Sequence, residues 1–390
     1  MYDMLKDIPL IDTHVHRIHP GREPEFGQIA GGYIKGKGQE YHARQTILYE
    51  MLMQALRVKF GMSEDTSNEQ VEEERCRRFS EDAEGYTREL FSEGNVAMSC
   101  FEIGSPLRGK AFTEEEVSWF NGLIPEDRRC VIVRVERSVD ELLPQKLPFS
   151  EFSDALIKDL DQRIVKEKAV GLKSSVAYYG GLNIALSDEK RAAASYEKIR
   201  SGEGTKEDEK CLYTYTLLQG VEMAAKHDIP LQIHTGAGGG SLDFKSFNPV
   251  GLTDFLRDPR VFDRVKIVLL HGGHPHEPDT SFLVAQFANV YTDCSGTFYL
   301  STTRGVNCMR ALMERAPLSK IMYGSDGVMM PELAWFGHQY FRKLLDKVMT
   351  QLVEEGFIRE SRVHEFAKMI MHNNALECYT KLSEKIEKIR

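Results

Sequence analysis

The fold is decided near the start of the chain by the stretch Ile8-Pro-Leu-Ile-Asp-Thr-His-Val-His16. Its apolar first half is typical of a short strand that is buried on both faces, as in a parallel sheet. Because alternate residues of a strand face the same side, His14 and His16 can both point at one centre. A His-x-His pair alone is a weak signal, but this pair follows a buried strand and Asp12. The stretch is therefore a candidate metal site.

Four more polar side chains follow apolar runs of the same kind. They are Lys173 after Ala169-Val-Gly-Leu172, His234 after Pro230-Leu-Gln-Ile233, His271 after Val265-Lys-Ile-Val-Leu-Leu270 and Asp326 after Lys320-Ile-Met-Tyr-Gly-Ser325. In a closed barrel of parallel strands, all carboxyl ends open onto one face, which is where active sites lie. Nitrogen and oxygen donors converging on that face are what a divalent metal ion requires.

Strand and helix signals alternate along the whole sequence. We expect one strand to end at Lys173, one to begin after Pro230, and the others at residues 8–11, 96–101, 130–135, 265–270, 289–293 and 321–324. This alternation predicts an α/β fold, specifically a (β/α)8 TIM barrel. An open doubly wound sheet is the alternative, but ligands from its first, fourth, fifth, sixth and eighth strands would not converge.

We expect a single domain over residues 1–390 with two insertions. Residues 18–90 form a long helical insertion after the first strand, with helices at 43–59, 69–79 and 86–91. Residues 187–209 form a charged insertion before a helix at 212–227. Further helices are expected at 281–287 and in the C-terminal tail, 361–390. The apolar stripe Phe152, Leu156, Leu160 and Ile164 predicts a helix packed on the outside of the barrel.

The composition limits the expected partners. The net charge of -9 argues against general affinity for nucleic acid or an anionic membrane. No apolar stretch approaches the roughly 20 residues that span a bilayer, and the first residues do not resemble a signal peptide. Seven scattered cysteines without a CxxC pair favour reduced thiols in the cytoplasm. We therefore expect a cytoplasmic protein whose partner is a small-molecule substrate, with a homo-oligomer left open.

Lys173 stands out because a lysine that faces a barrel interior needs a chemical reason. Carboxylation of its amine is one such reason, since it would turn a cation into an anionic oxygen ligand that bridges two metal ions.

The motifs together resemble the amidohydrolase superfamily, in particular the amidohydrolase-related (amidohydrolase 2) metal-dependent hydrolases. That branch includes the domain fused to glutamine-synthetase-like proteins in plants and fungi. The matching pieces are Ile11-Asp-Thr-His-Val-His16, Gly171-Leu-Lys-Ser-Ser-Val-Ala-Tyr178, Gln232-Ile-His-Thr-Gly236, Leu270-His-Gly-Gly273 and Tyr323-Gly-Ser-Asp326.

The resemblance implies a (β/α)8 barrel in which His14, His16 and Asp326 bind one metal ion. It also implies that a carboxylated Lys173 bridges to a second ion, held by His234 and His271. Zinc is the expected metal, with one or two ions per chain, because some members of this group keep only one.

These roles imply a metal-dependent hydrolase. The metal ion lowers the pKa of its bound water, so that hydroxide is available at pH 7, and polarises the scissile carbonyl. Asp326 would accept the proton of this water and deliver it to the leaving group. Asp326 and His271 are the expected catalytic residues. The expected reaction is cleavage of an amide C–N bond, or of a lactone or other ester, in a small molecule.

Two other functions stay open. One is the metal-dependent, non-oxidative decarboxylation of a small carboxylic acid. Relatives with this activity generally hold one metal ion and lack a lysine ligand on the fourth strand, so Lys173 favours hydrolysis. The other is a non-enzymatic binding or signalling domain, against which the intact ligand set speaks.

Three further residues are candidate substrate contacts. Tyr178, just past Lys173, could face a substrate or pack under the neighbouring loop. His274 belongs to a second His-x-His pair but lies in a proline-containing loop past the strand. Arg304 could pair with a substrate carboxylate, although most arginines in loops are merely solvated.

Overall fold

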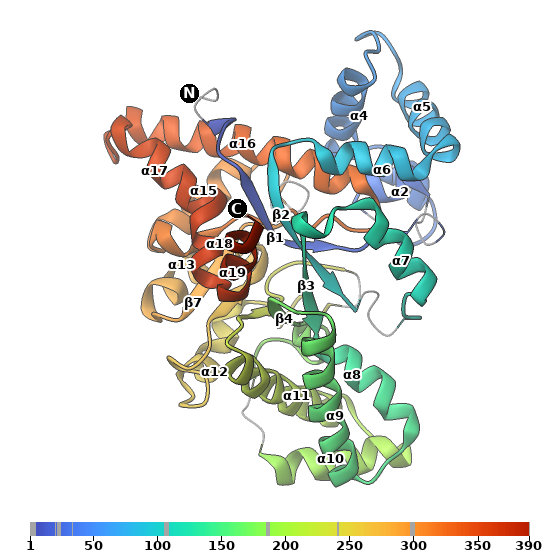
Figure 1. Cartoon of the computed structure of the whole chain (residues 1–390), viewed down its shortest axis with the longest axis vertical. Helices are drawn as coiled ribbons and strands as arrows, with labels where there is room; N and C mark the ends of the chain where they lie inside the picture. Colours follow the sequence, from blue (N-terminus) through green and yellow to red (C-terminus); the bar gives the residue numbers. More distant parts are fainter. Residues whose placement is uncertain are drawn as a thin grey trace.

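The computed structural model describes residues 5–19, 21, 25–32, 34–104, 109–184, 188–239, 242–296 and 301–389. Eight strands form one parallel sheet in which each strand pairs with the next along the chain. Helices surround this sheet (Figure 1). The strands are β1 (Leu10–His16), β2 (Val96–Ile103), β3 (Arg129–Arg134), β4 (Gly171–Ser174), β5 (Leu231–Ile233), β6 (Ile267–Leu269), β7 (Val290–Asp293) and β8 (Ile321–Met322). The predicted (β/α)8 barrel is confirmed.

The barrel closes between its first and last strands through backbone hydrogen bonds. Thr13 N donates to Tyr323 O at 3.1 Å, and His16 N donates to Gly327 O at 2.9 Å. Asp326 N donates in turn to His14 O at 2.7 Å. The chain after β8 therefore runs beside β1, and the two ends of the sheet meet.

The strand boundaries differ from the expected ones where polar side chains enter the barrel. β1 covers residues 10–16 rather than 8–11, because the segment carrying the histidines stays paired with β2, where His16 lies opposite Glu102. β3 ends at Arg134, since Val135 already opens the helix α8 (Val135–Leu142). β8 has only two residues, so Asp326 lies four residues past its end and has a left-handed backbone, with φ of 52°.

Alternate strand residues belong to two separate apolar clusters. Leu10, Val133 and Leu231 pack with the surrounding helices. The other faces form the barrel interior together with the C-terminal tail, with members such as Ile11, Met98, Cys100, Cys130, Ile132, Val268, Leu270, Met322, Tyr379 and Leu382. Because side chains alternate along a strand, the interior positions that follow Cys100 and Ile132 are Glu102 and Arg134. The barrel interior is thus apolar toward the amino ends of the strands and polar at their carboxyl ends.

The three outer helices that the sequence predicts, along the stripe 152–164 and at 212–227 and 281–287, are present. The stripe of Phe152, Leu156, Leu160 and Ile164 is buried, as expected, on α9. The described α-helices between β2 and β8 are α7 (Glu114–Leu123), α8, α9 (Phe149–Lys166), α10 (Glu189–Ser201), α11 (Lys206–His227), α12 (Thr253–Arg257), α13 (Glu277–Gln286) and α15 (Gly305–Met313). α11 begins six residues before the expected helix, because Thr205 and Asp208 form a capping box. The second expected insertion is therefore largely helical, and its first residue lies outside the described ones.

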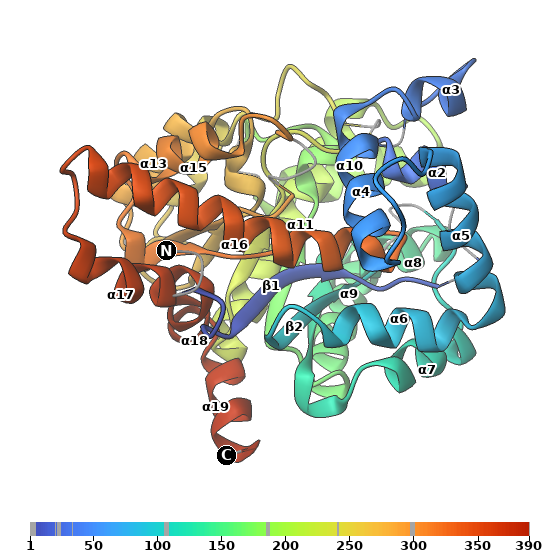
Figure 2. The same ribbon diagram turned by 90° about the horizontal axis from the view of Figure 1, so that it is seen from above.

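The insertion after β1 contains α2 (Phe26–Ala30), α3 (Gln39–Ala43), α4 (Ile47–Lys59), α5 (Asn68–Glu81) and α6 (Ala83–Ser92). Thr46 separates α3 from α4, since its hydroxyl accepts a hydrogen bond from Tyr49 N. The insertion shares an apolar cluster with the start of α16 (Pro331–Glu354), and the two lie together in Figure 2. A buried ion pair between Arg75 and Glu332, 2.5 Å apart, joins them.

The tail is not one helix but α17 (Val363–Lys368), a π-helical turn at Met369–Asn373, α18 (Asn374–Cys378) and α19 (Thr380–Ile389). Tyr379, at the break, is buried and accepts a hydrogen bond from Gln232 of β5 at 2.8 Å. The tail therefore covers the barrel interior from the amino ends of the strands. None of the described helices is both long and apolar enough to cross a membrane. All seven cysteines have free thiols.

Candidate metal centre

The six predicted ligands lie at the carboxyl-end mouth of the barrel. His14 and His16 belong to β1, and Lys173 belongs to β4. His234 follows β5 directly, His271 lies in the turn after β6, and Asp326 follows β8. The exposed fractions are small: 0% for His14, 2% for Lys173 and His271, 7% for His234 and 9% for Asp326. The six side chains therefore come from five strands to one buried region.

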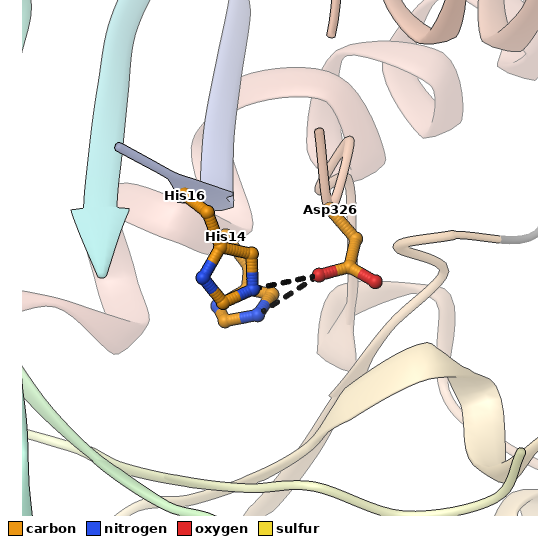
Figure 3. Close-up of side chains that lie close together, drawn as sticks. All are labelled: His14, His16 and Asp326. Carbon is orange, nitrogen blue, oxygen red and sulfur yellow. Dashed lines mark hydrogen bonds and ion pairs between the residues drawn. The ribbon is translucent and has the colours of Figure 1, made fainter. Parts of the chain in front are cut away.

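The tightest group is formed by His14, His16 and Asp326 (Figure 3). Oδ1 of Asp326 lies 3.3 Å from Nε2 of His14 and 3.2 Å from Nε2 of His16. One ligand atom from each residue lies within 4.8 Å of the other two. Two imidazoles and a carboxylate in this arrangement are a donor set suited to a transition-metal ion.

His234 and His271 form a second pair beside this group. Nε2 of His271 lies 3.0 Å from Nδ1 of His234. The other nitrogen of His271 lies 3.7 Å from Oδ2 of Asp326. Asp326 thus stands between the two groups of histidines, with one oxygen toward each.

Lys173 shares this region. Its register neighbours are Arg134 on β3 and Gln232 on β5. Burial lowers the pKa of its amine to about 8. The charge of Lys173 acts on His14 and His234, whose pKa values it lowers in addition to the effect of burial. A lysine with a lowered pKa is neutral more often near pH 7, which is the state that carboxylation requires.

The protonation states of the other ligands suit metal binding. Burial lowers the pKa of His14 to about 4 and that of His271 to about 3. For Asp326, burial would raise the pKa, but the neighbouring His271 and His14 hold it well below the usual range. Neutral imidazoles and an ionised carboxylate are the forms that bind metal ions. His16 differs, because its hydrogen bonds to Asp326 and Glu102 outweigh burial and raise its pKa.

The two imidazoles of β1 are held from behind by other side chains. Nδ1 of His16 lies 2.8 Å from Oε2 of Glu102, and Nδ1 of His14 lies 2.9 Å from Oε1 of Gln232. The amide of Gln232 donates in turn to Thr13 O and to the hydroxyl of Tyr379. Such outer partners fix the orientation of a metal-binding imidazole. They leave Nε2 of both histidines directed at Asp326.

Asp12 and Asp293 hold two further ligand-bearing segments, those of Asp326 and His271. Oδ1 of Asp12 accepts a hydrogen bond from Ser325 N at 2.8 Å, next to Asp326. Its Oδ2 lies 3.0 Å from Nε2 of His338 on α16. Asp293 accepts from His271 N at 2.8 Å, which supports the left-handed backbone of His271, with φ of 64°.

Three charged residues of this region were missed in the sequence: Glu102, Arg134 and Asp293. Each is the last or next-to-last residue of an apolar strand, as Lys173 is, so the same pattern could have identified them. Nη2 of Arg134 lies 2.7 Å from Oε2 of Glu102. Nε and Nη1 of Arg134 are buried, and no described residue accepts their hydrogens. Burial raises the pKa of Asp293 to about 7.

The three expected substrate contacts lie in different surroundings. The ring of Tyr178 is 4.7 Å from that of His234, and its hydroxyl accepts a hydrogen bond from Gly239 N at 3.0 Å. A side chain at Gly238 would meet this hydroxyl and Nε2 of His234, so the loop can approach them only with glycine there. His274 pairs with Glu277 instead, and Arg304 is exposed. The substrate roles of Tyr178, His274 and Arg304 therefore stay predictions.

Comparisons with known proteins bear on the whole arrangement. A family model described as amidohydrolase matches residues 172–380. The protein fluG of Emericella nidulans is 27% identical over 239 residues, which cover 58% of this chain. The match spans only 27% of fluG, so this chain corresponds to about a quarter of that relative.

Solved structures with the same fold extend over nearly the full chain. A protein described as a metal-dependent hydrolase from Lactobacillus casei has a TM-score of 0.81 at 19% identity, covering 99% of this chain and 98% of its own. A uronate isomerase from Thermotoga maritima has a TM-score of 0.71 at 18% identity, covering 97% and 96%. At these identities the two structures support the barrel fold.

Proposed function

Because the chain belongs to the amidohydrolase family, we propose that it is a metal-dependent hydrolase. Its reaction would be the cleavage by water of an amide C–N bond, or of a lactone or other ester, in a small molecule. The observation that carries this proposal is the position of Asp326 between the histidine pair of β1 and the pair formed by His234 and His271. The substrate bond is inferred from this chemistry.

The described residues fit a metal ion. Nε2 of His14 is buried, has no hydrogen-bond partner among them, and faces the same carboxylate oxygen as His16. His14, His16 and Asp326 would hold one ion. His234, His271 and a carboxylated Lys173 would hold a second. Zinc suits this set best, since imidazole and carboxylate ligands together favour it over magnesium or calcium.

Such an ion, when bound, supplies Lewis acidity toward water and toward the scissile carbonyl. Asp326 is kept ionised, so its carboxylate can take a proton from the attacking water. As the C–N bond breaks, the same carboxyl group returns that proton to the leaving nitrogen. Tyr178 accepts a hydrogen bond from Gly239, so its own hydroxyl hydrogen is available to a substrate oxygen.

Arg134 indicates the class of substrate. Arg134 is 4% exposed, and Nε and Nη1 of its guanidinium have no acceptor among the described residues. Leaving such donors unpaired is costly, whereas a substrate carboxylate could accept hydrogen bonds from Nη1, which carries two hydrogens. We therefore infer that the substrate carries a carboxylate. This observation also favours the alternative reaction, the metal-dependent decarboxylation of a small carboxylic acid.

A substrate panel separates these functions. Zinc-loaded protein would be incubated with N-acyl amino acids, γ-glutamyl amides, small lactones and aromatic carboxylic acids, before and after chelation. Hydrolysis that is lost on chelation and regained with zinc supports the proposal. Release of carbon dioxide without hydrolysis would establish the decarboxylase instead. Binding without turnover of any compound by fully metallated protein would favour a non-enzymatic domain.

A further inference from the structure

A second group of metal-binding side chains lies outside the proposed centre: His274, Glu277 and Cys308. His274 ends the turn after β6, Glu277 is the first residue of α13, and Cys308 belongs to α15. One ligand atom of each lies within 4.8 Å of the other two. Nδ1 of His274 is 2.6 Å from Oε1 of Glu277 and 3.9 Å from Sγ of Cys308. Glu277 and Cys308 are buried, and His274 is half-buried.

This geometry does not suit a nucleophilic cysteine. In a relay of cysteine, histidine and carboxylate, the thiol and the carboxylate contact opposite nitrogens of the ring. Here both lie against the same nitrogen, Nδ1 of His274. Burial also raises the pKa of the Cys308 thiol to about 12, so the thiolate forms near pH 7 only if a cation lies beside it.

The ligand atoms of His274, Glu277 and Cys308 are separated by distances similar to those between the ligands of one metal ion. Bonds of about 2.0–2.3 Å to a tetrahedral zinc ion place its ligand atoms roughly 3.3–3.6 Å apart. The present Nδ1–Sγ distance of 3.9 Å is close to this value. The shorter distance between Nδ1 and the carboxylate, 2.6 Å, corresponds to a hydrogen bond, and it would lengthen when an ion replaces the shared proton. The hydroxyl of Ser301 lies 2.9 Å from Sγ of Cys308.

We propose that His274, Glu277 and Cys308 form a separate site for one thiophilic divalent cation such as zinc. Binding would release the thiol proton, and the proton on Nδ1 of His274 would move to Nε2 so that Nδ1 can bind the ion. The thiolate and the Glu277 carboxylate would together balance the charge of the ion. The ion would tie the starts of α13 and α15 to the turn that carries His271. The ion would have a structural role. It would add to the hydrogen bond by which His274 O, in the same turn, accepts from Ala237 N in the loop after β5.

Cobalt spectroscopy distinguishes this site from the proposed centre, whose donors are nitrogen and oxygen alone. A cobalt(II)–thiolate bond gives a charge-transfer band in the near ultraviolet, and only the Cys308 site would produce it. Titration of metal-free protein with cobalt should give this band, with a final intensity that corresponds to one thiolate-bound ion per chain. The band should be absent from Cys308→Ser and retained in Cys76→Ser, a matched change at an exposed cysteine. It should also persist in His14→Ala.

A second variant guards against loss of folding in Cys308→Ser. His274→Ala keeps the thiol and should weaken cobalt binding at this site at least tenfold, while circular dichroism confirms the fold. Absence of a thiolate band in the wild-type protein would overturn the proposal. So would a band that survives in Cys308→Ser, or one that is unchanged in affinity in His274→Ala.

Discussion

Oδ1 of Asp326 and Nε2 of His16 lie 3.2 Å apart although 310 residues separate them in the chain. The contact exists because the backbone after β8 pairs with β1, where Asp326 N donates to His14 O. Closure of the barrel and assembly of the proposed metal centre are therefore one event. A change that opens the seam between β8 and β1 should remove metal binding as well.

Asp326 is the proposed proton carrier. A general base contributes roughly 10²–10⁴-fold to rate, so Asp326→Asn should reduce turnover by at least the lower value. The fold should persist, because the change is nearly isosteric. Metal content should fall less than in His14→Ala, since the amide oxygen can still coordinate. A fully metallated Asp326→Asn protein that turns over at the wild-type rate would show that another residue moves the proton.

Lys173 decides between one ion and two. If its amine is carboxylated, Lys173→Ala should lose one metal ion per chain and most activity, with partial rescue by short-chain carboxylates. Reconstitution of metal-free wild-type protein should require bicarbonate. The pKa of about 8 makes roughly a tenth of the amine neutral at pH 7, whereas an ordinary lysine is almost wholly protonated there. Equal metal uptake with and without bicarbonate would contradict this role and strengthen the decarboxylase alternative.

Glu102 should set metal affinity without binding the ion. It lies 2.8 Å from Nδ1 of His16, and loss of such an outer partner typically costs 10- to 100-fold in metal affinity. Glu102→Gln should therefore weaken binding by about that factor, as measured by competition with a chromophoric chelator. Glu141→Gln, which changes an exposed glutamate paired with Arg137 on α8, is the matched control. Equal losses in both variants would argue against a specific effect on His16.

Arg134 should determine affinity for the substrate carboxylate. Loss of a hydrogen bond to a charged group costs about 1.5–3 kcal/mol, so Arg134→Gln should raise KM about 10- to 100-fold. Arg134→Lys should recover only part of this loss, because lysine keeps the charge but not the planar fork. Arg137→Gln, outside the barrel, serves as the control. An unchanged KM for a carboxylate substrate, with metal content preserved, would remove Arg134 from the substrate site.

The barrel and its main ligands could be predicted from the sequence because each is a local pattern. Lys173, His234 and His271 each follow an apolar run, and this pattern is readable without knowledge of the partners. The same pattern was present at Glu102 and Arg134. Those residues were missed because a charged residue after a strand is equally typical of a turn to solvent.

Relationships between distant segments could not be read from the sequence. Nothing near Tyr379 indicates that its hydroxyl supports Gln232, 147 residues earlier, and through it His14. The position of Asp326 depends on closure of the seam, which only the folded backbone shows. Cys308 reaches His274 through the packing of α13 against α15, and the loop position of His274 gave no sign of this contact.

Anomalous diffraction at the zinc absorption edge, from crystals grown with zinc, tests the proposed centre most directly. The predicted result is an anomalous peak bounded by His14, His16 and Asp326, with a second peak beside His234 and His271 if Lys173 is carboxylated. Density for an intact barrel, with zinc in the medium and no anomalous peak near His14, His16 and Asp326, would contradict the account.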